Sequence, residues 1–240
     1  MLSALVVGSM APDFHYFLNL GPHWHFTHTV KGAFLFCLPV GLGVLWIFHA
    51  VIKLPLISLA SERHQSRLVL FATPFRWKPA GRFVLIVFSM LVGIGSHIVW
   101  DAFTHERGLF VRNVPDLRTA ALEEFGSHRP LYSFLQHGST LLGMALLIFW
   151  YWRWFKRTPP QPVPTYLKLN ALTRRWTVTL AIVIACGASL AYGYVISDHL
   201  ATLSVFAGAS AVALMSLVLV EALLFSLGWH WMVWKKRQLT

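Results

Sequence analysis

Long apolar runs, separated by short polar segments, dominate the chain. Five runs reach the roughly 20 residues that a helix needs to cross a bilayer. They lie near Val30–Ile52, Phe83–Phe103, Phe134–Phe155, Thr177–Ile196 and Ser204–Gly228. Each run must be helical, because lipid offers no hydrogen-bond partner to a free backbone N–H or C=O. The pattern predicts an all-α, polytopic transmembrane bundle of about five spans.

The polar segments between the runs differ in positive charge, and this difference predicts the orientation of the chain. Fifteen lysines and arginines follow the first, third and fifth runs, whereas five lie in the alternate segments. Cytoplasmic loops collect Lys and Arg. We therefore expect the N-terminus and the 104–133 loop to lie outside and the C-terminus inside.

The composition supports a membrane protein. Apolar residues make up 56% of the 240 residues and charged residues 12%, with a mean hydropathy of +0.59. A soluble domain carries about 25% charged residues, so a typical soluble enzyme or a disordered chain is excluded. The lysines and arginines behind the formal charge of +11 lie between the spans, as is typical of cytoplasmic loops. We therefore expect a lipid bilayer, and not nucleic acid, as the partner.

A proline-rich segment divides the chain. Residues 158–164 read TPPQPVP, and proline there prevents a helix and favours an extended linker. We expect a three-span N-terminal part over residues 1–157 and a two-span hairpin over residues 165–240.

Histidines gather on the predicted outer side. Nine of the twelve lie there or at the outer membrane border: His15, His23, His25, His28, His97, His105, His128, His137 and His199. Imidazole and carboxylate are the usual ligands of zinc and similar ions. The outer side is therefore where a divalent metal site is expected.

The sharpest cluster is the segment GSHIVWDAFTHERG. Its His97, Asp101 and His105 follow one another at intervals of four residues. On a helix, each is rotated only about 40° from the last, with a rise of ~6 Å. His97 and Asp101 can therefore bind one ion, or Asp101 can simply pair with His97 or Arg107. Gly93 leaves room either for a ligand or for another helix.

Further candidate residues flank this cluster. Gly8 and Pro12 break the first apolar stretch, so Asp13 is expected at a turn, either reaching an ion or capping a helix. His28 precedes the first span and can point into the same outer cavity. His105 and His137 are the candidate catalytic residues; the alternative for His137 is a hydrogen-bonded packing histidine.

Three segments carry a family resemblance: SALVVGSMAPDFHYF, FTHTVKGAFLFCLPVGL and GSHIVWDAFTHERG. In this order they resemble the bacterial domain-of-unknown-function 4184 family, over nearly all of the first 157 residues. Its members are uncharacterised multipass membrane proteins, which implies the bacterial inner membrane. Members usually begin with an upstream stretch that contains a histidine. If that histidine is a ligand, this chain carries an incomplete set.

A looser similarity links the chain to inner-membrane metal-dependent hydrolase-like proteins, which share the order PD…HS…H-x3-D. They are grouped with zinc phospholipase C and P1 nuclease. This similarity implies Asp13, His28, His97 and Asp101 as ligands of zinc or manganese.

Two functions remain open from the sequence. One is a metal-dependent hydrolase with an outward-facing site that acts on a lipid or envelope phosphoester. The other is a non-catalytic membrane scaffold or partner subunit, in which the His/Asp cluster is structural.

Overall fold

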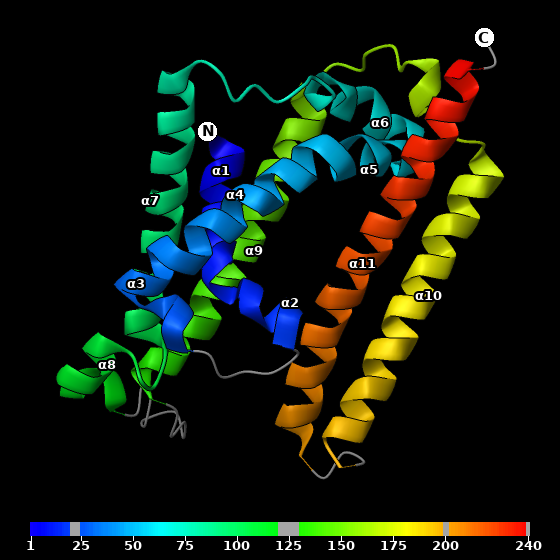
Figure 1. Ribbon diagram of the computed structural model, residues 1–240. Helices are drawn as coiled ribbons and strands as arrows, with labels where there is room; N and C mark the ends of the chain where they lie inside the picture. Colours follow the sequence, from blue (N-terminus) through cyan, green and yellow to red (C-terminus); the bar gives the residue numbers. More distant parts are fainter. Residues whose placement is uncertain (20–24, 120–129, 199–201, 239–240) are drawn as a thin grey trace.

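The fold is built from long apolar helices. The computed structural model describes residues 1–19, 25–119, 130–198 and 202–238, and every regular element within these ranges is helical. Within these ranges, five helical stretches are long and apolar enough to cross a membrane: Val30–Leu59, Ala80–Asn113, Leu131–Arg157, Thr165–Ile196 and Leu203–Lys236. They cover the five predicted runs and confirm the all-α class and the number of spans (Figure 1).

The first span is one helical stretch that two π-helical segments interrupt. It comprises α3 (Val30–Gly32), η3 (Ala33–Cys37), α4 (Leu38–Ile47), η4 (Phe48–Ile52) and α5 (Lys53–Leu59).

The first span therefore continues beyond its expected end at Ile52. Pro55 has no backbone N–H, so it cannot bond to the carbonyl of Val51 four residues earlier. That carbonyl instead accepts a hydrogen bond of 2.9 Å from Nε2 of His230 in the last span. A side chain from a neighbouring helix thus satisfies the group that the proline frees, as the membrane interior requires.

A short helix, α1 (Leu2–Met10), lies along α7 (Ala80–Thr104) and runs in the same direction (Figure 1). Glycines permit the close approach. A side chain on Gly8 would overlap the α7 backbone, and one on Gly93 would overlap the α1 backbone. Gly93 therefore makes room for a helix. Gly8 lies inside α1, so the expectation that it breaks the stretch was wrong.

Three short elements follow α1: η1 (Ala11–Phe14), α2 (His15–Asn19) and η2 (His25–His28). They lie in the same half of the bundle as α8 (Leu109–Asn113) (Figure 1). The beginning of α1 lies farther from α8, and the hydroxyl of Ser3 is there 3.1 Å from Nε2 of His49. Which side of the membrane each terminus faces stays a prediction.

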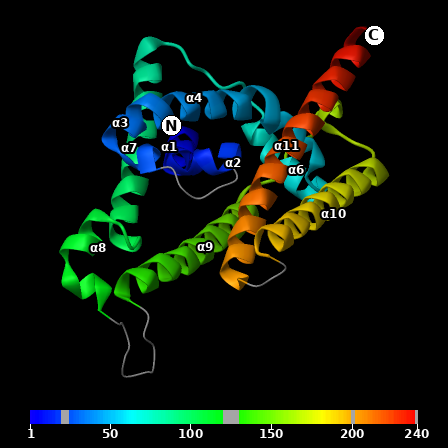
Figure 2. The same ribbon diagram turned by 60° about the horizontal axis from the view of Figure 1, so that its bottom comes forward.

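The larger apolar core of the described residues lies between α1, the first span and α7. Figure 2 shows α10 (Ala171–Ile196) and α11 (Leu203–Gln238) paired side by side, and α11 also contacts η4 and α5 of the first span. The core residues are Ala4, Ala11, Phe14, Ala33, Cys37, Leu45, Ile86, Met90 and Ile94. In contrast, α9 (Leu131–Arg157) buries no residue and exposes apolar side chains along its length. Such a surface is suited to lipid.

The remaining helical elements lie on the connecting segments: α6 (Glu62–Leu68), η5 (Val69–Phe71), η6 (Pro115–Arg118) and η8 (Thr165–Leu167). Residues 159–164 form no helix. Beyond them, α11 packs against α5, where Ile57, Leu167 and Trp229 form a second buried cluster. The division of the chain at residues 158–164 stays a prediction.

Candidate metal centre

The last turns of α7 supply two neighbouring polar side chains. Nε2 of His97 lies 3.1 Å from Oδ2 of Asp101, as their spacing on one helix face predicts. The helix ends at Thr104, and His105 follows in extended conformation. From there Nδ1 of His105 lies 3.4 Å from Oδ1 of Asp101. Asp101 therefore contacts His97 through one carboxylate oxygen and His105 through the other.

The turn after α1 brings a second carboxylate to this pair. Pro12 is the second residue of the 3₁₀ segment η1, which carries Asp13 directly after the end of α1. Oδ2 of Asp13 lies 3.7 Å from Nε2 of His97, and Oδ1 lies 3.6 Å from Nε2 of His28. The carboxylate thus faces the two histidines. The described residues show no side-chain cap from Asp13 to a helix N-terminus.

The second histidine is held at the start of the first span. The hydroxyl of Thr29 caps α3 by accepting a 3.0 Å hydrogen bond from the N–H of Gly32. A side chain on Gly32 would overlap the carbonyl of Phe26, so the glycine lets η2 fold back on α3. This fold directs His28 to the cluster, where its Nε2 lies 3.1 Å from Oδ2 of Asp101.

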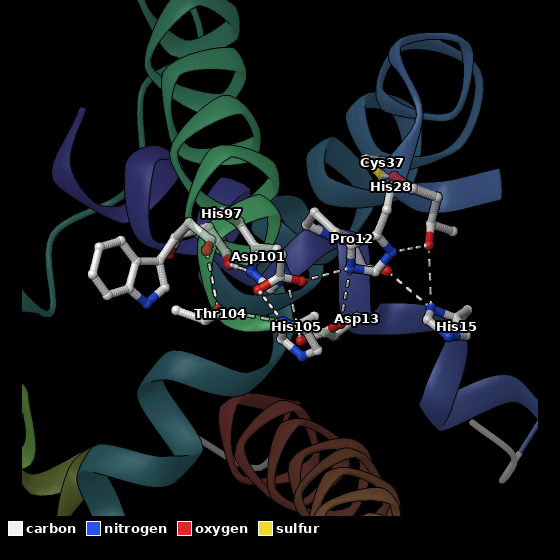
Figure 3. A network of polar contacts seen from close by, with 12 residues as sticks. Pro12, Asp13, His15, His28, Cys37, His97, Asp101, Thr104 and His105 are labelled. Atoms are coloured by element: carbon white, nitrogen blue, oxygen red, sulfur yellow. Dashed lines mark hydrogen bonds and ion pairs between the residues drawn. The ribbon is translucent and has the colours of Figure 1, made fainter. Parts of the chain in front are cut away.

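Figure 3 shows the resulting arrangement, in which three separate segments point toward one another. The ligand atoms of Asp13, His28 and His97 all lie within 4.8 Å of one another, and Asp101 approaches both imidazoles. Donors about 2.0–2.1 Å from a tetrahedral ion lie about 3.3–3.4 Å apart. The observed separations of 3.1–3.7 Å span that value. Small movements would therefore place these atoms around one divalent ion.

The unused nitrogen of each histidine is held by a neighbour. Nδ1 of His97 donates a 2.7 Å hydrogen bond to the carbonyl of Ser9, which leaves Nε2 to face the carboxylates. This Nε2 is buried and has no hydrogen bond of normal geometry among the described residues. Nδ1 of His28 lies 3.0 Å from the hydroxyl of the buried Thr27. Metal-binding histidines are typically oriented in this way by a carbonyl or a polar side chain.

Two further groups support this outer layer. Nδ1 of His15 donates to the carbonyl of Pro12 at 2.9 Å, and the buried ring of His15 lies 6.2 Å from that of His28. Sγ of Cys37 donates to the carbonyl of Thr27 at 3.3 Å. His15 therefore supports the turn that carries Asp13, and Cys37 fixes the backbone before His28.

The cluster is buried on one side and open on the other. The side chain of His97 is 15% exposed, whereas those of Asp13 and His105 are 44% and 51% exposed. The carboxylates of Asp101 and Asp13 raise the pKa of His28 to about 9 through hydrogen bonding and charge. The two carboxylates thus favour positive charge between them, as a cation site requires.

Not every predicted residue reaches the cluster. The side chain of His137 is exposed on α9, and no contact between described residues joins it to Asp101. Its neighbour Gln136 instead lies 3.5 Å from Nε2 of His105. His23, His128 and His199 lie outside the described residues, as does the side chain of His25.

Sequence reasoning missed the groups that orient the ligands. The carbonyl of Ser9 is a backbone group, which no residue type reveals. Thr27 had one available signal, its place directly before His28.

The architecture and the cluster together define the class: an α-helical membrane protein with a polar His/Asp centre at one end of its core. The chain belongs to the family described as Domain of unknown function (DUF4184), whose profile matches residues 1–227. A search of curated proteins and a search of solved structures found no match.

Proposed function

We propose that the protein is a membrane-embedded, metal-dependent hydrolase that binds a divalent cation, zinc or manganese, through Asp13, His28, His97 and Asp101. One observation carries this proposal: two imidazole nitrogens and two carboxylates converge from three segments of the chain. The buried Nε2 of His97, with no hydrogen bond of normal geometry among the described residues, supports it. Nitrogen and oxygen donors of this kind suit both ions.

The chemistry follows from the open side of the cluster. A divalent ion in such a site supplies Lewis-acid activation of water and of a phosphoryl or acyl oxygen. Oδ1 of Asp101 orients Nδ1 of His105, so Nε2 of this half-exposed imidazole faces away from the carboxylate. We assign to this nitrogen the transfer of a proton to and from the reacting water. His137 stays a prediction from the sequence.

The substrate class follows from the place of the cluster near the ends of two membrane spans. A phosphoester of a membrane lipid or of the cell envelope reaches this level without leaving the interface. The distribution of Lys and Arg supports an outward-facing site in a bacterial inner membrane.

A second candidate function is a non-catalytic scaffold. The observation that favours it is the position of Asp101, which contacts His28, His97 and His105 and so connects the first span to the end of α7. In that case the cluster stabilises the fold without taking part in a reaction.

Metal content measured by mass spectrometry on purified full-length protein tests the proposal. We expect about one tightly bound zinc or manganese ion per chain, lost in His97→Ala and Asp101→Ala, because the remaining donors do not complete a site. His64→Ala is the matched control, since His64 contacts Ser61 and lies outside the cluster. A folded wild-type protein without metal contradicts the proposal.

Hydrolysis decides between the two functions. The metal-loaded protein and its variants are assayed on a panel of phosphoesters and carboxyl esters, alongside thermal unfolding. Turnover that disappears in His105→Gln, with metal content unchanged, supports the hydrolase. Loss of thermal stability in Asp101→Ala, without turnover in any sample, supports the scaffold.

A further inference from the structure

A second polar site lies directly after the candidate metal centre in the chain. A pocket of about 570 Å³ is lined by Glu106, Arg107, Arg112, Arg118, Pro130 and Tyr132. Three arginines thus face one glutamate. The pocket therefore has a net positive lining and suits an anion.

The local fold explains why the arginines converge. The chain reverses tightly after α7, where the N–H of Gly108 bonds to the carbonyl of His105 at 2.8 Å. A Cβ on Gly108 would lie 2.5 Å from the carbonyl oxygen of Ala102, so this close turn requires glycine. The elements α8 and η6 follow and carry Arg112 and Arg118.

The entrance to α9 closes the other side of the pocket. The N–H of Leu131 donates a 3.0 Å hydrogen bond to the carbonyl of Thr119, just after η6. This bond holds Tyr132 beside the arginines. Backbone hydrogen bonds between these segments therefore hold the lining residues of the pocket in place.

Two of the arginines have no carboxylate partner within the ranges that the structure describes. Among the described residues, no ion pair reaches Arg112 or Arg118. Arginine presents a planar set of N–H donors that matches the oxygens of a phosphate group. Two guanidinium groups that line one pocket can together bind the two non-bridging oxygens and the single negative charge of a phosphodiester.

Exposed apolar side chains on the segment that carries Arg112 indicate the source of the phosphate. On α8 and just after it, Leu109 is 64% exposed, while Phe110 and Val114 are each 38% exposed. The ring of Phe110 stacks on Phe103 of α7 at 4.0 Å, which holds α8 against the end of the span. Exposed apolar residues next to arginines at the end of a span are typical of the membrane interface.

We propose that Arg107, Arg112, Arg118 and Tyr132 bind the phosphate of an anionic phospholipid headgroup, with its acyl chains against Leu109, Phe110 and Val114. Arg107 follows His105 by two positions, so the bound headgroup lies next to the His/Asp cluster. The identification of this lipid as the substrate class rests on the proposed function. The binding of the lipid to the arginine pocket does not.

Binding of short-chain dioctanoyl phosphatidylglycerol to the full-length, chelator-treated protein in detergent tests the proposal by calorimetric titration. In Arg112→Gln/Arg118→Gln we expect at least a roughly tenfold loss of affinity, because charge-assisted arginine–phosphate bonds are among the stronger polar contacts. The matched control is Arg153→Gln/Arg157→Gln, with the same change of charge at the exposed far end of α9. It should change affinity less than about twofold, because these residues are far from the pocket.

Several outcomes overturn the proposal. Equal losses of lipid affinity in the two double variants indicate unspecific attraction by net charge. Inorganic phosphate that binds as tightly as the lipid indicates a soluble ligand, and dioctanoyl phosphatidylcholine that binds equally well removes the preference for anionic lipid.

The two proposals fail separately. Lipid binding that persists in wild-type protein shown to hold no metal contradicts the metal centre and leaves the lipid site standing. Metal-dependent turnover of phosphatidylglycerol that is unchanged in Arg112→Gln/Arg118→Gln contradicts the lipid site and leaves the hydrolase standing.

Discussion

The helix pairs α1–α7 and α10–α11 are both packed closely through a glycine, but among the described residues only the first pair carries a polar centre. In each pair a glycine lies where the helices touch: Gly93 against the α1 backbone, and Gly193 against Ser210 and the α11 backbone. In the first pair, the carbonyl of Ser9 on α1 then accepts a hydrogen bond from His97. In the second pair, the described residues place no His/Asp cluster at the contact.

The difference shows what close packing contributes to a polar centre. Small residues let two helices approach until backbone groups of one lie within reach of side chains on the other. Such contact is purely structural when the facing turns are apolar. It becomes a means of orienting a ligand when a histidine lies one turn beyond the glycine, as His97 does beyond Gly93. Variants at these glycines and at the orienting groups separate the structural role from the orienting role.

The largest effect is expected from Gly93→Ala. The new Cβ would lie 2.7 Å from the backbone nitrogen of Ser9, so α1 must move away from α7. Overpacking of this kind costs about 1–3 kcal/mol, and more where backbone must shift. Because the carbonyl of Ser9 moves with α1, we expect both the melting temperature and the metal content to fall.

Two glycine variants make this test specific. Gly95→Ala, on the same helix with open space around it, should change neither quantity. Gly193→Ala should lower the melting temperature of the protein, because the new Cβ disturbs the α10–α11 contact. The metal content should stay at the wild-type value. Metal loss in Gly193→Ala would show that the two pairs are not separate in function.

Thr27→Val tests the outer layer of the centre without touching a ligand. Valine keeps the shape of threonine but removes the hydroxyl that contacts Nδ1 of His28. Loss of an orienting partner typically lowers metal affinity about 10–100-fold. Competition with a fluorescent zinc chelator measures this change, and Thr140→Val, exposed on α9, is the control. Unchanged affinity in Thr27→Val would remove the orienting role.

Metal affinity should also depend on pH. Asp101 and Asp13 raise the pKa of His28 to about 9, so this imidazole is protonated at neutral pH when no metal is bound. An imidazole that binds a metal ion must first be deprotonated, so metal binding displaces that proton. Affinity should therefore rise up to about tenfold per pH unit below pH 9 and level off above it. Calorimetry in buffers of different ionisation enthalpy counts the released proton. An affinity that is independent of pH between 6 and 8 contradicts this assignment.

The smallest effect is expected from His230→Ala, a change in α11 of the second helix pair. Without this imidazole, the carbonyl of Val51 loses the hydrogen-bond donor that replaces the N–H that Pro55 lacks. An acceptor left without a partner costs about 1 kcal/mol or somewhat more. The melting temperature should fall and the metal content should stay constant. His230→Gln should restore part of the stability through its side-chain N–H.

The amino-acid sequence alone determined the spans and one pair within the centre. The runs of apolar residues are long enough that the bilayer dictates helices, and no competing structure satisfies the backbone in lipid. His97 and Asp101 are local neighbours on one helix, so their spacing fixes their contact.

Only the tertiary structure decided which other residues join that pair. Asp13 and His28 reach it because α1 packs along α7 and because η2 folds back on α3, and neither contact has a periodic signal in the sequence. The packing of α9 against α7 places Gln136 near His105 and leaves His137 exposed. Contacts between distant segments depend on how whole helices approach one another, and a backbone acceptor such as Ser9 carries no residue-specific mark at all.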